Sequence, residues 1–259
     1  MNQYAHPKGR PRLRKAISDF YSPEFRKPDG NGEDLSRFKD GESLPKIRED
    51  QGRELDPETE IQITSGANGG IYASMTALLN PGNVGSNDHD RSAGKSFACT
   101  GWRIGWAIGP SHLIKPVLAA HTRIVFSTNS PAAESVASAL EESKTNGFFK
   151  SQVEDYKSLR SLLSNILIDL KIPHTFPHGA YFILADFSKL KIPKDFEFPE
   201  GIEKKGKGFK NAWFVAVEAG VVGIPASAFY SEENAEIGQD FIRFSFCKQR
   251  RRLNRLEKG

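Results

Sequence analysis

The chain has no long apolar run and very little cysteine. No stretch of 18 apolar residues occurs in its 259 residues, and its beginning lacks the apolar stretch of a secretory signal, so we expect no membrane-spanning segment. The two cysteines, Cys99 and Cys247, form no CxxC pair, which argues against a disulfide framework and for a reducing compartment. The histidines are not spaced with cysteines or carboxylates as metal ligands are, so no metal site is predicted. We expect a cytoplasmic protein, with a mitochondrial location as the alternative.

An excess of basic charge is also absent from most of the chain. The net charge is +4, but residues 248–259 hold six of the 36 basic residues and one of the 32 acidic ones, so the rest is close to neutral. No nucleic-acid-binding motif accompanies this basic tail, and we expect neither a nucleic-acid nor a membrane partner. The alternative, phosphate-backbone binding through the tail, predicts salt-sensitive binding that is lost when residues 249–259 are deleted.

Composition and hydrophobic periodicity divide the chain. Residues 26–54 hold fifteen charged residues in twenty-nine, without a hydrophobic period, which predicts a disordered insertion. Around it, short strands alternate with helices, and the longest helix spans about residues 148–170. We expect an α/β protein with one domain over residues 1–147 and a C-terminal domain over residues 148–259.

Individual elements can be placed from the same periodicity. Strands are predicted within residues 61–64, 102–110, 181–187, 221–225 and 241–247. The helix predicted over residues 111–126 contains Pro116 and is expected to be interrupted there. In the last predicted strand, alternation places Arg243 on the more polar face, opposite Ile242 and Phe244.

A glycine-rich turn, SGANGG, follows the strand that begins at Ile61. The helix after the turn has an expected apolar stripe of Ile71, Met75, Leu78 and Leu79. Free backbone N–H groups at a helix N-terminus favour an anion, so a phosphate is a possible ligand of the turn residues Gly66, Ala67 and Asn68. The alternative is an ordinary loop between a strand and a helix.

Lys95 lies among small residues in the segment SAGKSFACTGWRIGWAIGP. Ser92 precedes it by three positions and Arg103 follows it by eight, so both are able to reach a common anion. A buried amine near a cation loses proton affinity and attacks carbonyl groups. Pyridoxal 5′-phosphate offers an aldehyde and a phosphate together. The segment therefore predicts that Lys95 binds the aldehyde while Ser92 and Arg103 hold the phosphate.

This segment resembles the lysine motif of the class I and II aminotransferases, the fold-type I pyridoxal-phosphate enzymes. Within that family it is similar to kynurenine aminotransferases and cysteine-S-conjugate β-lyases of fungal type. Four other segments resemble the family in the same order: NQYAHPKGRPRLRKAISDFYSP, ITSGANGGIYASMTALLNPG, HGAYFILADFSKLKIP and FIRFSFCK. The resemblance implies the aspartate aminotransferase-like fold, with a truncated large domain and an α+β C-terminal small domain.

The resemblance also implies a role for each matched residue. Lys95 would form the internal aldimine with pyridoxal 5′-phosphate and then move the substrate proton. The phosphate would be held by Ser92, Arg103 and the turn residues Gly66, Ala67 and Asn68. Tyr4 would reach the neighbouring cofactor across a homodimer interface, and Arg243 would pair with the substrate α-carboxylate. Without the resemblance, Tyr4 is a surface ring, Ser92 a helix cap and Arg243 a surface ion pair.

Part of the family pattern is missing between Leu79 and Ser92, where only twelve residues stand. Twelve residues are too few for one βαβ unit. Most of the large domain therefore has no counterpart, including the aspartate that keeps the cofactor's pyridine nitrogen protonated. Neither Asp88 nor Asp90 is assigned that role.

Two hypotheses follow. The first is a transaminase of the kynurenine–oxoglutarate type, which moves an amino group from an aromatic or sulfur amino acid to a 2-oxo acid. The second is a truncated or mis-spliced remnant without catalysis, which acts at most as a cofactor-binding or dimerisation partner.

Overall fold

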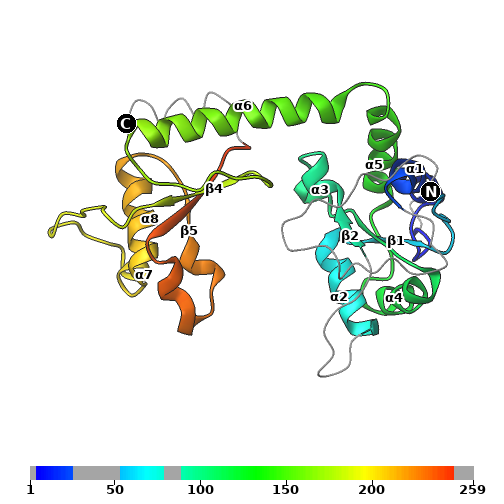
Figure 1. Ribbon diagram of the computed structural model, residues 1–259. Coiled ribbons are helices and arrows are strands. Elements are labelled where there is room, and N and C mark those ends of the chain that lie inside the picture. The colour runs from blue at the N-terminus through cyan, green and yellow to red at the C-terminus, as the bar shows by residue number, and fades with distance from the viewer. Residues whose placement is uncertain (1–3, 26–52, 79–88, 248–259) are drawn as a thin grey trace, which may run out of the picture. The chain divides into compact units, whose positions relative to one another are not determined.

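The computed structural model describes residues 4–25, 53–78 and 89–247 (Figure 1). The chain divides into two compact units, Met1–Gly147 and Phe148–Gly259. Most of the insertion expected over residues 26–54 lies outside the described residues, as does the basic tail. Among the helices of the described residues, none combines the length and the apolar character needed to cross a membrane.

A three-stranded sheet forms the centre of the first unit. Its strands are β1 (Ile61–Thr64), β2 (His89–Ser92) and β3 (Gly105–Ile108), in the order β1-β3-β2. Strand β3 pairs antiparallel with both neighbours. All residues of β1 and β3 are buried, as expected for strands covered on both faces.

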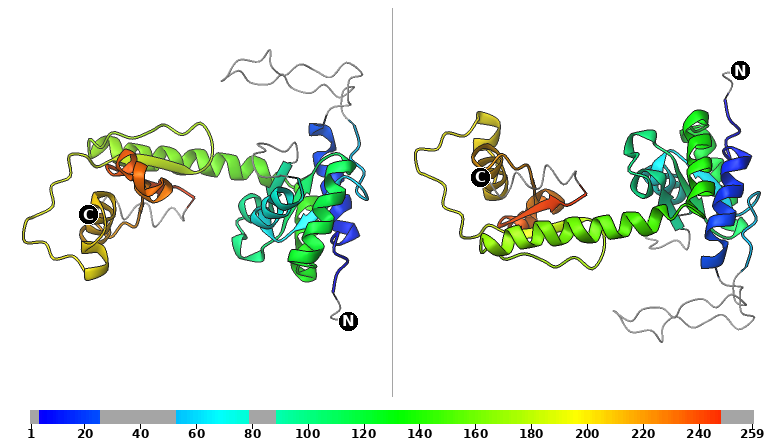
Figure 2. Two further views of the ribbon diagram at one scale, coloured as in Figure 1. Left: turned by 90° about the horizontal axis from the view of Figure 1, so that it is seen from below. Right: turned by 90° about the horizontal axis from the view of Figure 1, so that it is seen from above.

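Helices surround this sheet. The helical elements of the unit are α1 (Pro11–Tyr21), η1 (Ser22–Glu24), α2 (Gly66–Leu78), α3 (Ala93–Ser96), η4 (Thr100–Trp102), α4 (Ser111–Ile124) and α5 (Ser130–Ser143). Helix α2 packs against α4, and α1 packs against α5; the second pair appears side by side in both views of Figure 2. Leu13 and Ile17 of α1 and Trp106 of β3 are fully buried in one core, and each such side chain stabilises the fold by about 1.5–3 kcal/mol.

Two expectations about these helices are wrong. Helix α4 continues through Pro116 without interruption, because the buried residues Ile114, Val117 and His121 anchor the helix on both sides of the proline. Of the apolar stripe predicted for α2, Ile71 and Met75 are 46% and 53% exposed, Leu78 is half-buried, and Leu79 lies outside the described residues. The buried residues of α2 are instead the small Gly66, Gly70, Ala73 and Ser74, and the helix packs against both α4 and β3.

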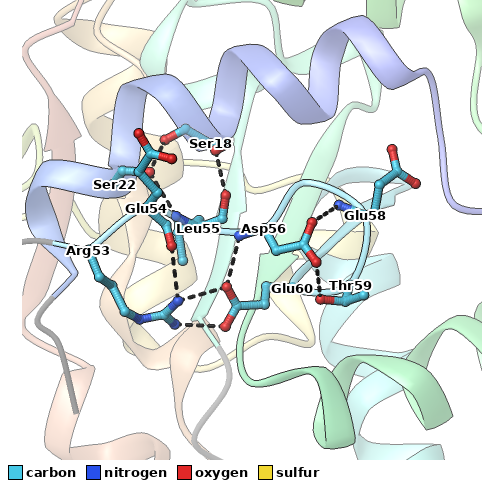
Figure 3. A network of polar contacts seen from close by, with 9 residues as sticks. All are labelled: Ser18, Ser22, Arg53, Glu54, Leu55, Asp56, Glu58, Thr59 and Glu60. Carbon is cyan, nitrogen blue, oxygen red and sulfur yellow. Dashed lines mark hydrogen bonds and ion pairs between the residues drawn. The ribbon is translucent and has the colours of Figure 1, made fainter.

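The end of the predicted insertion is also different from the expectation. Arg53 lies in the described part of the chain, and its guanidinium forms two hydrogen bonds of 2.7 and 2.8 Å to the carboxylate of Glu60. Figure 3 shows how the next residues are fixed: the Ser18 hydroxyl donates to the Leu55 carbonyl at 2.7 Å, and the Leu55 amide donates to the Ser22 hydroxyl at 3.0 Å. Residues 53–60 are therefore part of the folded unit.

The second unit contains an antiparallel sheet. Its strands are β4 (Phe182–Asp186), β5 (Ile224–Pro225) and β6 (Phe241–Ser245), in the order β4-β6-β5. The helical elements are α6 (Phe148–Asp169), α7 (Glu200–Glu203), α8 (Lys207–Glu218), η5 (Ala226–Phe229) and η6 (Glu232–Gly238). Residues alternate between buried and half-buried along β4 and β6, which confirms that Arg243 lies opposite the buried Ile242 and Phe244.

Helix α6 is amphipathic over only part of its length. Leu163, Ile166 and Leu167 are buried, and Leu163 and Leu167 belong to the core of the second unit. Val153, nearer the beginning of the helix, is exposed. Tyr156 and Leu159 are partly buried against the same core, whereas Leu170, just past the end of the helix, is exposed.

Candidate functional site

Strand register brings two separate segments to one edge of the first sheet. Gly105, the first residue of β3, pairs with Thr64 on one side and with Ser92 on the other. Thr64 is followed by α2 and Ser92 by α3, so both helices begin beside Gly105. A Cβ at Gly105 would lie 2.7 Å from the Ala67 amide nitrogen and 2.7 Å from the Arg91 carbonyl oxygen, so only glycine fits between the two segments.

The first turn of α2 presents backbone N–H groups at this edge. The helix begins at Gly66, and the N–H groups of its first residues, including Ala67 and Asn68, have no acceptor within the helix. Gly66 has φ +67°, a conformation that favours glycine, and its carbonyl accepts a hydrogen bond from the Thr64 hydroxyl at 2.9 Å. The positive end of the helix dipole is therefore located where an anion is able to bind.

Arg103 contributes a positive charge to the same place. A Cβ built on Gly66 would lie 2.6 Å from the Arg103 Nη2 atom, so the guanidinium rests directly against the Gly66 backbone. Arg103 has φ +55°, and its Nη1 donates to the Thr100 carbonyl at 3.1 Å. The structure thus brings together Arg103 and the glycine turn, which are separated by more than thirty positions in the sequence.

Ser92 caps helix α3 in this structure. Its hydroxyl oxygen accepts a hydrogen bond of 3.3 Å from the Gly94 amide, which is the alternative role that its sequence context allows. A serine hydroxyl keeps a donor proton while its oxygen accepts, so the cap leaves Ser92 able to donate to an anion. Ser92 and Thr64 pair with Gly105 from its two sides, so one residue of β3 separates them in the sheet.

Lys95 is exposed, which corrects the expectation of a buried amine. Helix α3 is a single turn whose buried residues are Ala93 and Gly94. The close approach of the Thr100 backbone, with its Cα 2.9 Å from a Cβ built on Gly94, keeps this side of the turn against the protein. Lys95 follows on the other side, so the described residues of the first unit do not bury it.

Cys99 is the one nucleophilic thiol in this segment, and it is not activated. It packs against the core of the first unit, and burial raises the pKa of its thiol above the ordinary value. A raised pKa lowers the fraction of reactive thiolate. The described residues also contain no group of three histidines, cysteines or carboxylates that would hold a metal ion.

Two further predicted residues lie away from this edge or in the other unit. Tyr4 is 86% exposed, with its ring edge against Phe126 at 5.5 Å between centroids, so within this chain it is a surface ring. Arg243 belongs to β6 of the second unit. Its Cζ atom lies 4.1 Å from the ring centroid of Phe182 and 4.2 Å from that of Phe229.

Sequence reasoning missed several residues of these sites. Gly105 has no distinguishing signal in the sequence, because strand register cannot be read from periodicity alone. Phe182 and Phe229 come from two segments whose contact with Arg243 depends on the pairing of β4 and β5 with β6. The phenylalanine in HGAYF was a usable signal, since alternation along that strand places it on the same face as Leu184.

Solved structures share this architecture. Bna3p from Saccharomyces cerevisiae aligns over 99% of this chain and 83% of its own, with a TM-score of 0.80 and 25% sequence identity. An aspartate aminotransferase from Thermus thermophilus aligns over 99% of this chain and 82% of its own, with a TM-score of 0.70 and 18% identity, a likeness of fold alone. The molecule is thus a protein of the aspartate aminotransferase-like fold, as the sequence predicts.

The chain belongs to the family described as aminotransferase class I and II, whose profile matches residues 90–256. Members of this family use pyridoxal 5′-phosphate. The chain is 41% identical over 158 residues to the yeast protein named "Probable kynurenine--oxoglutarate transaminase BNA3". It is 37% identical over 160 residues to a kynurenine–oxoglutarate transaminase of Dictyostelium discoideum. Each match covers 61% of this chain but only 36% and 37% of those relatives, so the chain spans little more than a third of their length.

Proposed function

We propose that this chain binds pyridoxal 5′-phosphate at the Gly105 edge and acts in transamination between an aromatic or sulfur amino acid and a 2-oxo acid. The observation that carries the proposal is the convergence of the α2 N-terminus, Ser92 and Arg103 around Gly105. The names of the two relatives favour kynurenine and 2-oxoglutarate as the substrate pair.

The residues at this edge fit the phosphate of the cofactor. The amides of Ala67 and Asn68 and the guanidinium of Arg103 supply donors and positive charge, and the Ser92 hydroxyl supplies another donor. Gly66 and Gly105 lie between these donors. A Cβ would meet the Arg103 guanidinium at 2.6 Å at Gly66, and the Gly66 backbone at 2.5 Å at Gly105. The two glycines therefore let Arg103, the α2 N-terminus and β3 pack closely together, which gathers the proposed phosphate donors at one edge.

Lys95 is the amine of the proposed site. When bound, pyridoxal 5′-phosphate supplies an aldehyde that condenses with amines and a conjugated ring that withdraws electrons from the substrate α-carbon. Lys95 follows the phosphate-binding Ser92 by one helical turn, and its role is to hold the aldehyde and then to carry the proton at the α-carbon. Its exposure leaves it accessible to the aldehyde.

The remaining roles concern substrate and assembly. Arg243 holds the α-carboxylate of the substrate through its planar set of N–H donors. Tyr4, exposed in the single chain, reaches the neighbouring site in a homodimer. In this proposal Met1–Gly147 is the truncated cofactor-binding domain, Phe148–Gly259 is the small domain, and the protein is cytoplasmic.

A second candidate is a chain that binds the cofactor without turnover. It is favoured by the short coverage of the relatives and by the twelve residues between Leu79 and Ser92, which leave no assigned carboxylate for the pyridine nitrogen. Such a chain would act as a cofactor-binding or dimerisation partner.

Covalent labelling tests the binding proposal. The purified chain is mixed with pyridoxal 5′-phosphate, reduced with borohydride, and digested for mass spectrometry. We expect the label on Lys95 and its loss in Lys95→Arg. Binding should be at least about tenfold weaker in Ser92→Ala and in Arg103→Gln, because the first loses a neutral hydrogen-bond donor and the second a charged one. Lys115→Arg, at an exposed lysine of α4, is the matched control.

Two outcomes separate the candidates. A label spread equally over Lys95 and Lys115 would show that the amine is not selected, and the binding proposal would be wrong. With Lys95 labelled, incubation with kynurenine and 2-oxoglutarate and chromatographic measurement of glutamate decides between transamination and binding alone.

A further inference from the structure

The guanidinium of Arg243 is held between two aromatic rings. In the sheet, Arg243 pairs with Leu184 of β4 and with Ile224 of β5. Its Cζ lies 4.1 Å from the Phe182 centroid and 4.2 Å from the Phe229 centroid, both within the stacking range of a cation over a ring. Within the described residues, no ring contact joins Phe182 to Phe229, as expected for rings on two sides of a flat group.

The hydrogen-bond donors of this guanidinium are unused within the described part of the chain. Other arginines there behave differently: Arg14 bonds to Glu58 and to two carbonyls, and Arg53 bonds to both oxygens of Glu60. Arg243, in contrast, meets neither a carboxylate nor a carbonyl acceptor among the described residues. Stacking occupies the faces of a guanidinium, whereas its N–H groups point outward in the plane and stay available to an acceptor.

We propose that Phe182 and Phe229 are positioning residues that orient Arg243 to bind a carboxylate through two parallel N–H donors. This inference rests on the substrate role of Arg243 in the proposed function. An arginine side chain has many rotamers, and binding a planar carboxylate requires one of them. Rings on two sides restrict the guanidinium to one plane before the ligand arrives, which reduces the entropy lost on binding.

Phe229 is the more informative of the two rings. It lies at the end of the short helix η5 and is 56% exposed, so its removal creates no cavity in the core. An exposed phenylalanine that contacts an arginine has little reason to contribute to folding. Its effect on Arg243 can therefore be separated from an effect on stability.

Nuclear magnetic resonance of the full chain tests the inference through the Nε–H signal of Arg243. The ligand is 3-phenylpropanoate, a monocarboxylate with an aromatic tail, and Arg243→Lys assigns the signal. We expect a saturable shift in the wild type, about tenfold weaker binding in Phe229→Leu, and recovery in Phe229→Tyr, which keeps the ring. The loss of the ring also moves the free Arg243 signal downfield, because ring-current shielding disappears.

The control is Phe198→Leu, which removes a ring of the same unit that contacts Lys210 at 5.4 Å and should leave the binding unchanged. Phe182→Leu is a second variant with the same expected loss. Equal binding by the leucine and tyrosine variants at position 229 would overturn the positioning role while the role of Arg243 stands. An unresponsive Arg243 signal in the wild type would overturn both, whereas labelling of Lys95 tests cofactor binding independently.

Discussion

The amide of Arg53 donates a hydrogen bond of 3.0 Å to the carbonyl oxygen of Phe25. Residues 26–52 therefore leave and re-enter the first unit at the same point. On the re-entering side, Leu55 is buried and bonded to α1 through Ser18 and Ser22 (Figure 3). The fold of the first unit is thus closed around the ends of this segment.

The closed ends make the segment removable. We expect that replacing residues 26–52 with a linker of about four glycine and serine residues leaves the fold intact and raises the free energy of unfolding by about 1–2 kcal/mol, because a shorter loop costs less entropy to close. Urea unfolding followed by tryptophan fluorescence measures this change. A chain that loses cooperative unfolding after the replacement would show that the segment contributes contacts of its own.

The Ser18 hydroxyl connects α1 to the re-entering chain. Ser18→Ala leaves the buried Leu55 carbonyl without this donor, and we expect a loss of about 1–2 kcal/mol in the free energy of unfolding. Ser135→Ala is the matched control, since Ser135 donates to the Pro131 carbonyl at 3.0 Å on an exposed face of α5. The control should change stability by less than about 0.5 kcal/mol, and equal effects of the two variants would contradict the role of Ser18.

Two features restrict position 66 to glycine, the positive φ and the contact with Arg103, and comparison with other glycines separates their effects. In Gly66→Ala the new Cβ meets Arg103, and the positive φ is strained, so we expect a loss of stability of about 1–3 kcal/mol and of binding to inorganic phosphate and pyridoxal 5′-phosphate. Gly220 also has φ +67° but no atom within 4 Å of a Cβ. Gly220→Ala should therefore lose stability through strain alone and keep phosphate binding, as measured by calorimetry.

The third glycine, Gly101, has neither restriction, since no atom lies within 4 Å of its Cβ position and its φ is not positive. Gly101→Ala should leave both quantities unchanged. If Gly66→Ala bound phosphate as well as Gly101→Ala does, Arg103 would have no role in holding an anion.

His121 should make the first unit sensitive to mild acid. It is fully buried on α4, 3.4 Å from the Gln62 side chain through its Nδ1, and burial lowers its pKa below the ordinary value of 6.5. Because the unfolded chain binds this proton more readily, the free energy of unfolding is highest above pH 6.5. It should fall as the pH drops below that value, by at most about 1.4 kcal/mol per pH unit.

The pH dependence is measured by urea unfolding between pH 7.5 and 5. Tryptophan fluorescence is followed in a variant that keeps Trp106 as its single tryptophan. His121→Gln should remove the part of the slope between pH 6.5 and 5. His112→Gln, at an exposed histidine of the same helix, should leave it in place. An unchanged slope in His121→Gln would assign the acid sensitivity to other groups.

Local patterns in the sequence predicted most elements of the fold. Alternation correctly places Arg243 opposite Ile242, and the helix expected over about residues 148–170 is α6, Phe148–Asp169. Patterns failed where tertiary packing decides. Apolar Ile71 and Met75 suggest the buried face of α2, but the residues that the fold buries are the small Gly66, Gly70, Ala73 and Ser74.

The candidate site was predictable as a set of residues and not as an arrangement. Lys95, Ser92 and Arg103 are close in sequence, so spacing is enough to group them in one prediction. Their relation to the glycine turn depends on β3 lying between β1 and β2, which no local signal specifies. The exposure of Lys95 could not be predicted either, since it depends on which side of a single helical turn packs against the backbone.

The central position of β3 has a dynamic consequence. Thr64, which precedes α2, and Ser92 both pair with Gly105, so a fluctuation that separates β3 from either neighbouring strand would disperse the proposed phosphate donors. An anion that is bound by donors on both sides of β3 would therefore stabilise the pairing of the three strands. Its binding should slow hydrogen exchange at the amides of β3, whose residues are all buried.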